Sequence, residues 1–91
     1  MSMFSFNIAV TRQFTDRDEE CLALFKDETY AWIFIQGLRA LDEANGLVTY
    51  TGDKAFEQEG IAVSSEKEDG GGYVAILGDN GVTVTYRLRL S

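Results

Sequence analysis

The sequence predicts an α+β fold in which a mostly antiparallel β-sheet packs one face on one or two helices. Two patterns carry this prediction: apolar residues at helical spacing in the first half, and strict apolar–polar alternation near the C-terminus. The length of 91 residues suits a single compact domain over residues 1–91. We expect the element order β-α-α-β-β-β-β.

The first element should be a strand over residues 4–11. Large apolar side chains alternate there with small or polar ones, which is typical of a strand with one buried face. That face would carry Phe4, Phe6, Ile8 and Val10.

A helix is expected next, over about residues 16–26. The hydroxyl of Thr15 can accept a hydrogen bond from a first-turn N–H, and acidic residues follow at the positive end of the helix dipole. Its apolar stripe would be Cys21, Leu24 and Phe25. Cys21, the single cysteine, is expected to be a small buried apolar residue.

Residues 29–44 can be interpreted in two ways. The run TYAWIFI is rich in aromatic and β-branched residues and would suit a short buried strand. We favour a helix, because apolar residues keep helical spacing through Leu41 and Asn45-Gly46 is a suitable stop. This helix would bring Trp32, Phe34, Leu38 and Leu41 against the strand residues Phe4, Phe6, Ile8, Val84, Tyr86 and Leu88.

The second half of the chain is expected to form strands at 47–51, 61–65, 73–77 and 82–90. The last strand should bury its apolar face and leave its Thr and Arg face in water. GDNG at 78–81 should close a hairpin. Residues 52–60 are expected to form a loop with at most one helical turn, pinned to the core by Phe56.

The glycine-rich segment 66–72 is expected to be a flexible hairpin tip. It precedes no helix, and no Lys-Ser or Lys-Thr pair follows, so it does not fit a phosphate-binding loop.

The composition argues against catalysis. The chain has no His and one Cys, so it cannot build a His-dependent triad or a zinc site from several thiols and imidazoles. Asp16 and Asp18 have the spacing of the first two ligands of a calcium-binding loop, but the central glycine and the terminal Glu of such a loop are missing. We therefore expect a protein that is not an enzyme and that has no catalytic residues, no cofactor and no metal.

Acidity is the main functional signal, with fifteen Asp and Glu against eight Lys and Arg, a net charge of −7. Two segments, 16–28 and 53–69, each carry six carboxylates against two cations, a net −4 apiece. Their carboxylates form the candidate partner-binding set: Asp16, Asp18, Glu19, Glu20, Asp27, Glu28, Asp53, Glu57, Glu59, Glu66, Glu68 and Asp69. A helix over 16–28 would space six carboxylates about 3.3 Å apart along its axis, close to the phosphate spacing of one DNA strand.

In length, acidity, α+β pattern and lack of catalytic groups, the chain resembles the small acidic inhibitors of the anti-CRISPR and anti-restriction type that phages encode. The resemblance carries over no individual residue. It implies a non-catalytic protein that inhibits a nucleic-acid-binding complex, with DNA mimicry as one way of doing so. The expected partner is a basic surface of a protein or nucleoprotein complex, with no direct nucleic acid and no membrane.

Other interpretations stay open. Concentrated acidity would equally suit an immunity or antitoxin protein that covers the basic cleft of a nuclease or toxin. The chain could also be a structural or oligomerisation module that pairs through the edge of 82–90 or through exposed aromatic residues. We expect a monomer or weak homodimer in the cytoplasm, of a bacterial host if a phage encodes it.

Overall fold

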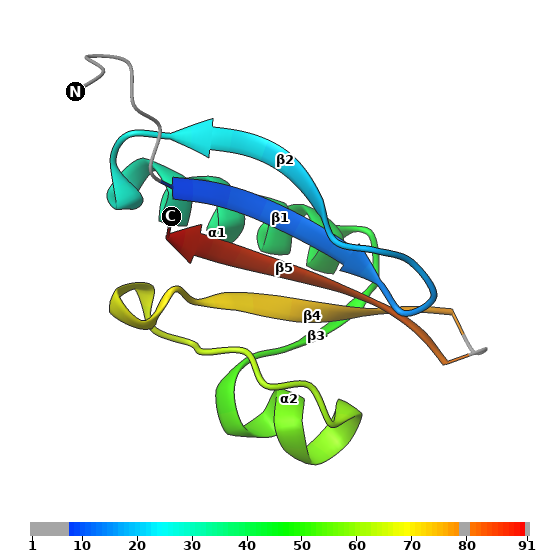
Figure 1. The fold of residues 1–91 in the computed structure, drawn as a ribbon. Coiled ribbons are helices and arrows are strands. Elements are labelled where there is room, and N and C mark those ends of the chain that lie inside the picture. Colours follow the sequence, from blue (N-terminus) through cyan, green and yellow to red (C-terminus); the bar gives the residue numbers. More distant parts are fainter. Residues whose placement is uncertain (1–7, 79–80, 91) are drawn as a thin grey trace.

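A computed structural model describes residues 8–78 and 81–90, and it has an α+β fold as predicted. Five antiparallel strands form one sheet in the order β2-β1-β5-β4-β3 (Figure 1). The strands are β1 (Ile8–Phe14), β2 (Glu20–Phe25), β3 (Val48–Tyr50), β4 (Gly72–Leu77) and β5 (Val82–Leu90). The helices are α1 (Glu28–Ala44), α2 (Gly52–Glu59) and the short 3-10 helix η1 (Lys67–Asp69).

Strand β5 lies at the centre of the sheet. It pairs with β1 from Ile8↔Leu90 to Phe14↔Val84 and with β4 from Gly72↔Arg87 to Leu77↔Val82. The predicted antiparallel pairing of the last two strands is therefore confirmed, although residues 79–80 of the expected turn lie outside the described residues. The idea that 82–90 pairs chains through a free edge is wrong, because both edges of β5 are occupied.

Helix α1 confirms the helical interpretation of 29–44 and lies across one face of the sheet (Figure 1). The carboxylate of Asp27 accepts a hydrogen bond from the Thr29 N–H at 2.7 Å and caps the N-terminus. Asn45 is the C-cap, and Gly46 follows with φ of 87°, the left-handed conformation that glycine adopts without strain. The C-terminal stop is therefore the predicted one, whereas the cap at Asp27 was not predicted from the sequence.

The core between α1 and the sheet is only partly the predicted one. Tyr86 faces inward as expected and stacks on Tyr73, with ring centroids 4.9 Å apart. The helix buries Ala31 and Ile35 completely, with Trp32 and Leu38 packed beside them. The predicted core residues Phe34 and Leu41 are instead 37% and 58% exposed, because they lie on the side of α1 that turns away from the sheet. Phe4 and Phe6 lie outside the described residues.

The helix predicted over 16–26 is wrong, since Glu20–Phe25 is the edge strand β2. Arg12 faces Glu20 across the β1–β2 pair and forms an ion pair with it at 2.6 Å, so the carboxylates expected on a helix join neighbouring strands instead. Thr15 caps no helix; its hydroxyl accepts from the Thr83 N–H at 2.7 Å and anchors the turn to β5. Cys21 is exposed, not buried, because it lies on an edge strand.

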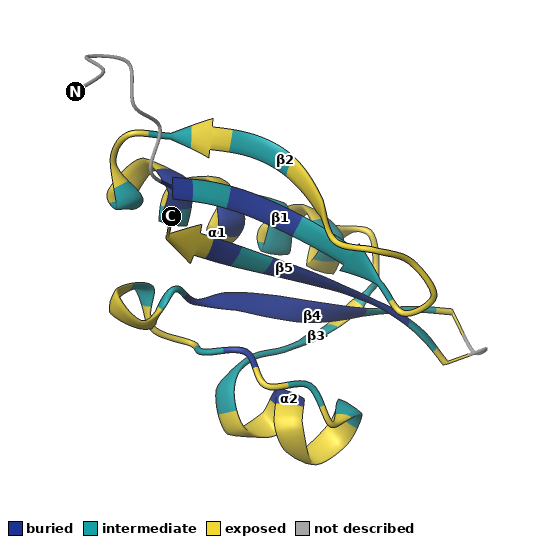
Figure 2. Ribbon diagram, viewed as in Figure 1, coloured by how far each residue is buried: buried dark blue, intermediate teal, exposed yellow. Residues whose placement is uncertain are grey.

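The loop predicted at 52–60 and the strand predicted at 61–65 are also wrong. Residues 52–59 form the helix α2 instead of a loop, and Phe56 is 64% exposed while Ala55 turns inward. Residues 61–65 are not a strand, although Gly52 and Gly72 donate to the carbonyls of Val63 and Ser64. Ala55, Val63 and Val74 form a second small cluster on the sheet face opposite α1. The threonines of β5 that were expected in water are consequently buried (Figure 2).

The glycines at 70–72 are not a flexible tip. Gly70 ends η1 with φ of 68°, while Gly71 and Gly72 are buried. A Cβ atom on Gly72 would lie 1.9 Å from the Tyr86 carbonyl oxygen, and one on Gly71 would lie 2.6 Å from that of Glu66. These glycines permit close backbone packing between η1, β4 and β5.

Candidate functional site

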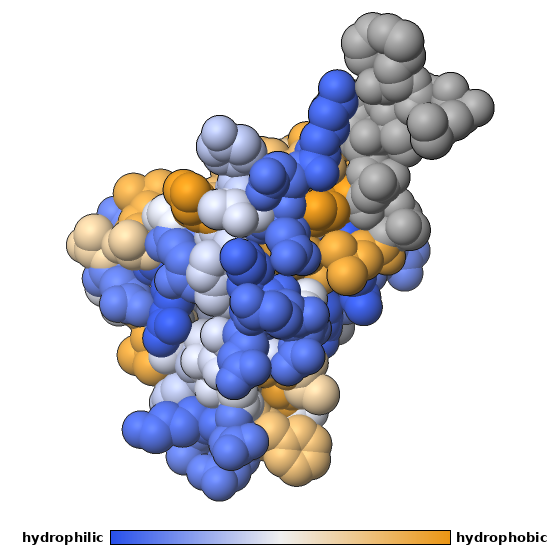
Figure 3. Space-filling view, turned by 90° about the vertical axis from the view of Figure 1, so that its left-hand side faces the viewer, coloured by the Kyte–Doolittle hydropathy of each residue, from blue (hydrophilic) through white to orange (hydrophobic). Residues whose placement is uncertain are grey.

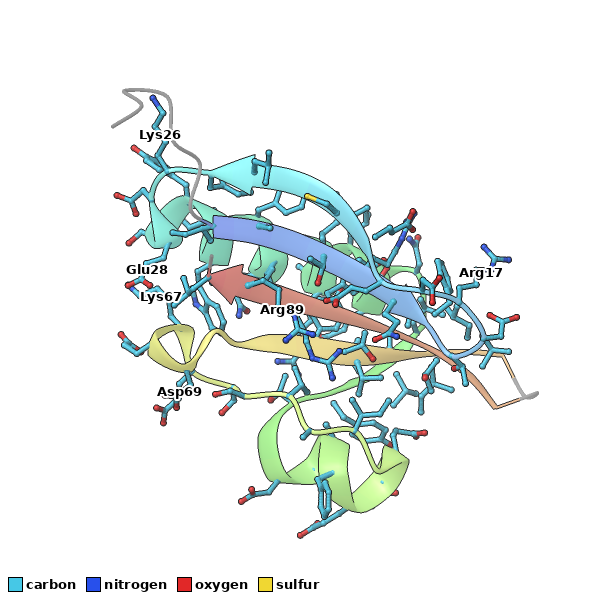
Figure 4. The ribbon with its side chains drawn as sticks, in the orientation of Figure 1. Arg17, Lys26, Glu28, Lys67, Asp69 and Arg89 are labelled. Carbon is cyan, nitrogen blue, oxygen red and sulfur yellow. The ribbon has the colours of Figure 1, made fainter. Side chains whose placement is uncertain are left out.

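Three segments that are distant in sequence bring acidic side chains to one end of the molecule. We call this set the acidic end; it comprises Asp27, Glu28, Asp53, Glu66, Glu68 and Asp69. Glu28 and Asp69 lie near Lys67 at the start of α1 and in η1 (Figure 4). The view onto this end is mostly hydrophilic, with hydrophobic residues at its margins (Figure 3). Six carboxylates and the three lysines at 26, 54 and 67 give the region a net charge of −3.

Hydrogen bonds of side chains hold the acidic end together. Lys67 of η1 donates from Nζ to the Thr29 hydroxyl of α1 at 3.4 Å, which ties the two elements. The Glu66 N–H donates to the Ser64 hydroxyl at 3.1 Å and shapes the entry into η1. Within the described part of the chain, the carboxylates of Glu66, Glu68 and Asp69 make no hydrogen bond or ion pair. They are therefore available for an external partner.

An open pocket of about 620 Å³ lies between η1 and α2 at this end. Asp53 of α2 lines it on one side, and Glu66 and Asp69 line it on the other. Its floor includes Val63 and its rim includes the exposed ring of Phe56. A cationic group with an apolar stem, such as a lysine or arginine side chain, matches this combination of carboxylates and apolar surface.

The remaining predicted acidic residues are elsewhere. Glu20 pairs with Arg12, and Glu19 pairs with Arg89 at 3.0 Å and accepts from the Thr11 hydroxyl. The hydrogen bond from Arg89, followed by that from Thr11, lowers the pKa of Glu19 from its ordinary value. These two carboxylates are largely neutralised by cations of the same chain.

The other four belong to two groups. Asp16 and Asp18 are exposed in the β1–β2 turn, at the end of β2 away from the start of α1, while Glu57 and Glu59 lie on α2. The expected row of six carboxylates at phosphate spacing does not form, because β2 separates the residues of segment 16–28.

Sequence reasoning missed a second pocket, of about 350 Å³, on the sheet face opposite α1. Thr83, Thr85 and Arg87 of β5 line it together with Gln13 and Glu59. The Arg87 guanidinium donates to the Ala62 carbonyl at 3.2 Å, and burial, followed by the neighbouring charge of Arg89, lowers its pKa. The alternation in 82–90 correctly places the β5 side chains on one face of the sheet. The pocket was missed because its opposite wall comes from segment 52–65, whose structure was predicted incorrectly.

The described residues contain neither a metal-binding cluster nor a helix that could span a membrane. No group of three or more His, Cys, Asp or Glu side chains in the described part of the chain is arranged to hold a metal ion. None of the helices described is long and apolar enough to span a bilayer. Comparison of the chain with protein-family models, with curated proteins and with solved structures found no match.

Proposed function

We propose that the protein is a non-catalytic binding protein that uses its acidic end to inhibit a nucleic-acid-binding complex. Six carboxylates gather around the starts of α1, α2 and η1, and three of them, Asp53, Glu66 and Asp69, line an open pocket; this convergence is the observation that supports this function. Clustered negative charge attracts Lys- and Arg-rich surfaces and speeds their encounter. Such surfaces line the channels in which proteins hold DNA and RNA.

The acidic end is a better candidate than the β1–β2 turn for two reasons. Two of its carboxylates without intramolecular partners, Glu66 and Asp69, line one concave surface together with Asp53, and that surface also offers an apolar contact through Phe56. Asp16 and Asp18 stand on a narrow turn, with Arg17 lying 3.8 Å from Asp16. A partner would gain less from two carboxylates that a cation partly neutralises.

A charge-reversal experiment tests the proposal. The variant Glu66→Lys/Glu68→Lys/Asp69→Lys changes the acidic end, and the variant Asp16→Lys/Asp18→Lys/Glu57→Lys makes the same total charge change elsewhere. All six positions are exposed, so at about 0.15 M salt, where surface charges are screened, both proteins should keep a melting transition close to that of the parent. Each serves as bait in nuclease-treated lysates of bacteria that carry CRISPR and restriction systems, with retained complexes identified by mass spectrometry.

The expected result has three parts. The parent retains a nucleic-acid-handling complex and inhibits its DNA binding in a gel shift, the control variant does the same, and the acidic-end variant loses at least tenfold in affinity. Binding by the parent also weakens between about 0.1 M and 1 M salt, as the Debye length falls from about 10 Å to 3 Å. Equal binding by both triple variants, or binding that salt does not change, would contradict the proposal. Retention of a toxin nuclease would instead favour the immunity class.

A further inference from the structure

Helix α1 has two apolar sides, and the sheet covers only one of them. Buried Ala31 and Ile35 mark the side that faces the sheet. A second set of residues falls within an arc of about 120° on the outer side, at 100° per residue. We call this set the apolar flank; it comprises Tyr30, Ile33, Phe34, Gly37, Ala40, Leu41 and Ala44. It contains no charged side chain in a protein of net charge −7.

The apolar flank is exposed over the full length of the helix. Tyr30, Ile33 and Leu41 are 66%, 59% and 58% exposed. Phe34 is 37% exposed and contacts the ring of Phe25 in β2, with centroids 5.6 Å apart. Single exposed apolar side chains are ordinary, whereas a contiguous patch marks an interaction surface. The four large side chains together expose on the order of 400 Å², about half of what one partner of a standard interface buries.

The apolar flank is complementary in side-chain size to the flank of a second copy that runs in the opposite direction. Its N-terminal half carries large residues, and its C-terminal half carries Ala40, Leu41 and Ala44. If a second α1 packed antiparallel across a two-fold axis at Gly37, Tyr30 would face Ala44 and Phe34 would face Ala40. Large side chains of one helix would then fill the spaces over small residues of the other, as packing of ridges into grooves requires. Only Ile33 and Leu41 would meet as two large residues.

We propose that the apolar flank is the interface of a homodimer, with a second copy of this chain packed antiparallel across Gly37. The absence of a side chain at Gly37 lets the two helices approach closely at the axis. Charge favours the same orientation. An α1 of 17 residues is about 25 Å long, so antiparallel packing keeps the two acidic ends apart by more than a Debye length of about 8–10 Å.

Gly37→Lys provides the decisive variant. A Cβ atom at this position has no atom within 4 Å, and lysine is a better helix former than glycine, so the single chain should fold at least as well as the parent. In the dimer, two lysines would meet on the axis and hold the helices apart. Gln36→Lys adds the same charge to the adjacent exposed position, which lies outside the apolar flank, and serves as the matched control.

Sedimentation equilibrium over a range of protein concentrations measures the outcome. The 10.1 kDa chain and its Gln36→Lys variant should approach a mass of about 20 kDa at high concentration. Gly37→Lys should dimerise at least tenfold more weakly while its circular dichroism spectrum stays helical. Added salt should strengthen the dimer by screening the repulsion between two acidic chains, the opposite of its effect on binding through the acidic end.

Cross-linking gives a second test of the geometry. At helix-axis separations of about 8–10 Å, the two Cα atoms at residue 37 would lie roughly 3.5–5.5 Å apart, which overlaps the range that a disulfide spans. In a Cys21→Ser background, Gly37→Cys should therefore form a disulfide-linked dimer on mild oxidation, and Gln36→Cys should not.

Three results would overturn the dimer. The first is a parent that stays monomeric at every concentration, and the second is a dimer that Gly37→Lys leaves unchanged. The third is a monomer that dimerises only after residues 1–7 are removed, which would identify the N-terminal segment as the occupant of the flank. None of these results bears on the acidic end, whose residues do not overlap with the flank.

Discussion

At the scale of single residues, one tyrosine and one glutamate show how position changes the ordinary pKa of a side chain. The Tyr73 hydroxyl donates to the Asp42 carboxylate at 2.7 Å, and burial together with this bond raises the pKa of Tyr73. Glu19 has the opposite environment, because the Arg89 guanidinium and the Thr11 hydroxyl both stabilise its charged form. It joins β1, β5 and the start of β2 through side chains alone.

We predict that Glu19→Gln lowers the free energy of unfolding by about 1 kcal/mol at pH 7, the scale of a charge-assisted surface contact. The pKa of Glu19 is lower in the folded state than its ordinary value of 4.5, so its stabilisation is present above that value. It is lost as the pH falls through the folded-state pKa. Urea denaturation of both proteins at several pH values should show the gap closing in acid.

Asp16→Asn is the control for this titration. Asp16 is exposed in the neighbouring turn and makes only a 3.8 Å contact with Arg17, so its substitution should change stability by a few tenths of a kcal/mol at most. A difference between parent and Glu19→Gln that stays constant from neutral to acidic pH would show that packing, and not the charge of Glu19, stabilises this corner.

At the scale of elements, close backbone contact explains why β4 begins with glycine. We predict that Gly72→Ala destabilises the protein by about 2–3 kcal/mol. The added Cβ atom would lie 1.9 Å from the Tyr86 carbonyl oxygen, so β4 and β5 would have to move apart to accommodate it. Thermal melts of dilute protein should show a fall of roughly 10 °C or more, since 1 kcal/mol shifts the midpoint by about 4–8 °C at this size.

Gly37→Ala is the natural comparison, because nothing lies within 4 Å of the added Cβ and alanine is the better helix former. That substitution should raise the midpoint. Midpoints that moved in the same direction for both variants would argue against the close packing of β4 on β5.

The sequence predicted those elements whose signals are local. Helical spacing of apolar residues and the stop at Asn45-Gly46 predicted α1, and strict alternation predicted β5. It failed at 16–26, where a good local helix start was outweighed by the Arg12–Glu20 pair and the Thr15–Thr83 bonds. Those partners are distant along the chain, so no local pattern could reveal them.

The sequence predicted which residues belong to the candidate site but not how they group in space. Counting charges identified all six residues of the acidic end but attached them to two separate segments. The regrouping depends on η1 folding against the start of α1, where Lys67 reaches Thr29. Two residues of the apolar flank, Phe34 and Leu41, were predicted to lie in the core for a related reason: helical spacing shows that they share a side of α1, but not whether the sheet covers that side.

At the scale of the whole molecule, charge repulsion opposes the compact fold. Four ion pairs join described residues, and they involve Asp16, Glu19, Glu20 and Glu43. Most of the other carboxylates face water, and several crowd together at the acidic end. Self-repulsion of this kind weakens a folded state until salt screens it.

We predict that the melting midpoint rises as NaCl increases from about 0.01 M to 0.15 M, because the Debye length falls from about 30 Å to 8 Å. Glu68→Lys should raise the low-salt midpoint, since it relieves repulsion at the acidic end without removing an ion pair, and salt should shrink its advantage. Glu20→Lys makes the same charge change but breaks the pair with Arg12, so it should gain less or lose stability. Identical midpoints for the two variants at low salt would mean that net charge alone, and not the crowding at the acidic end, governs the stability of this fold.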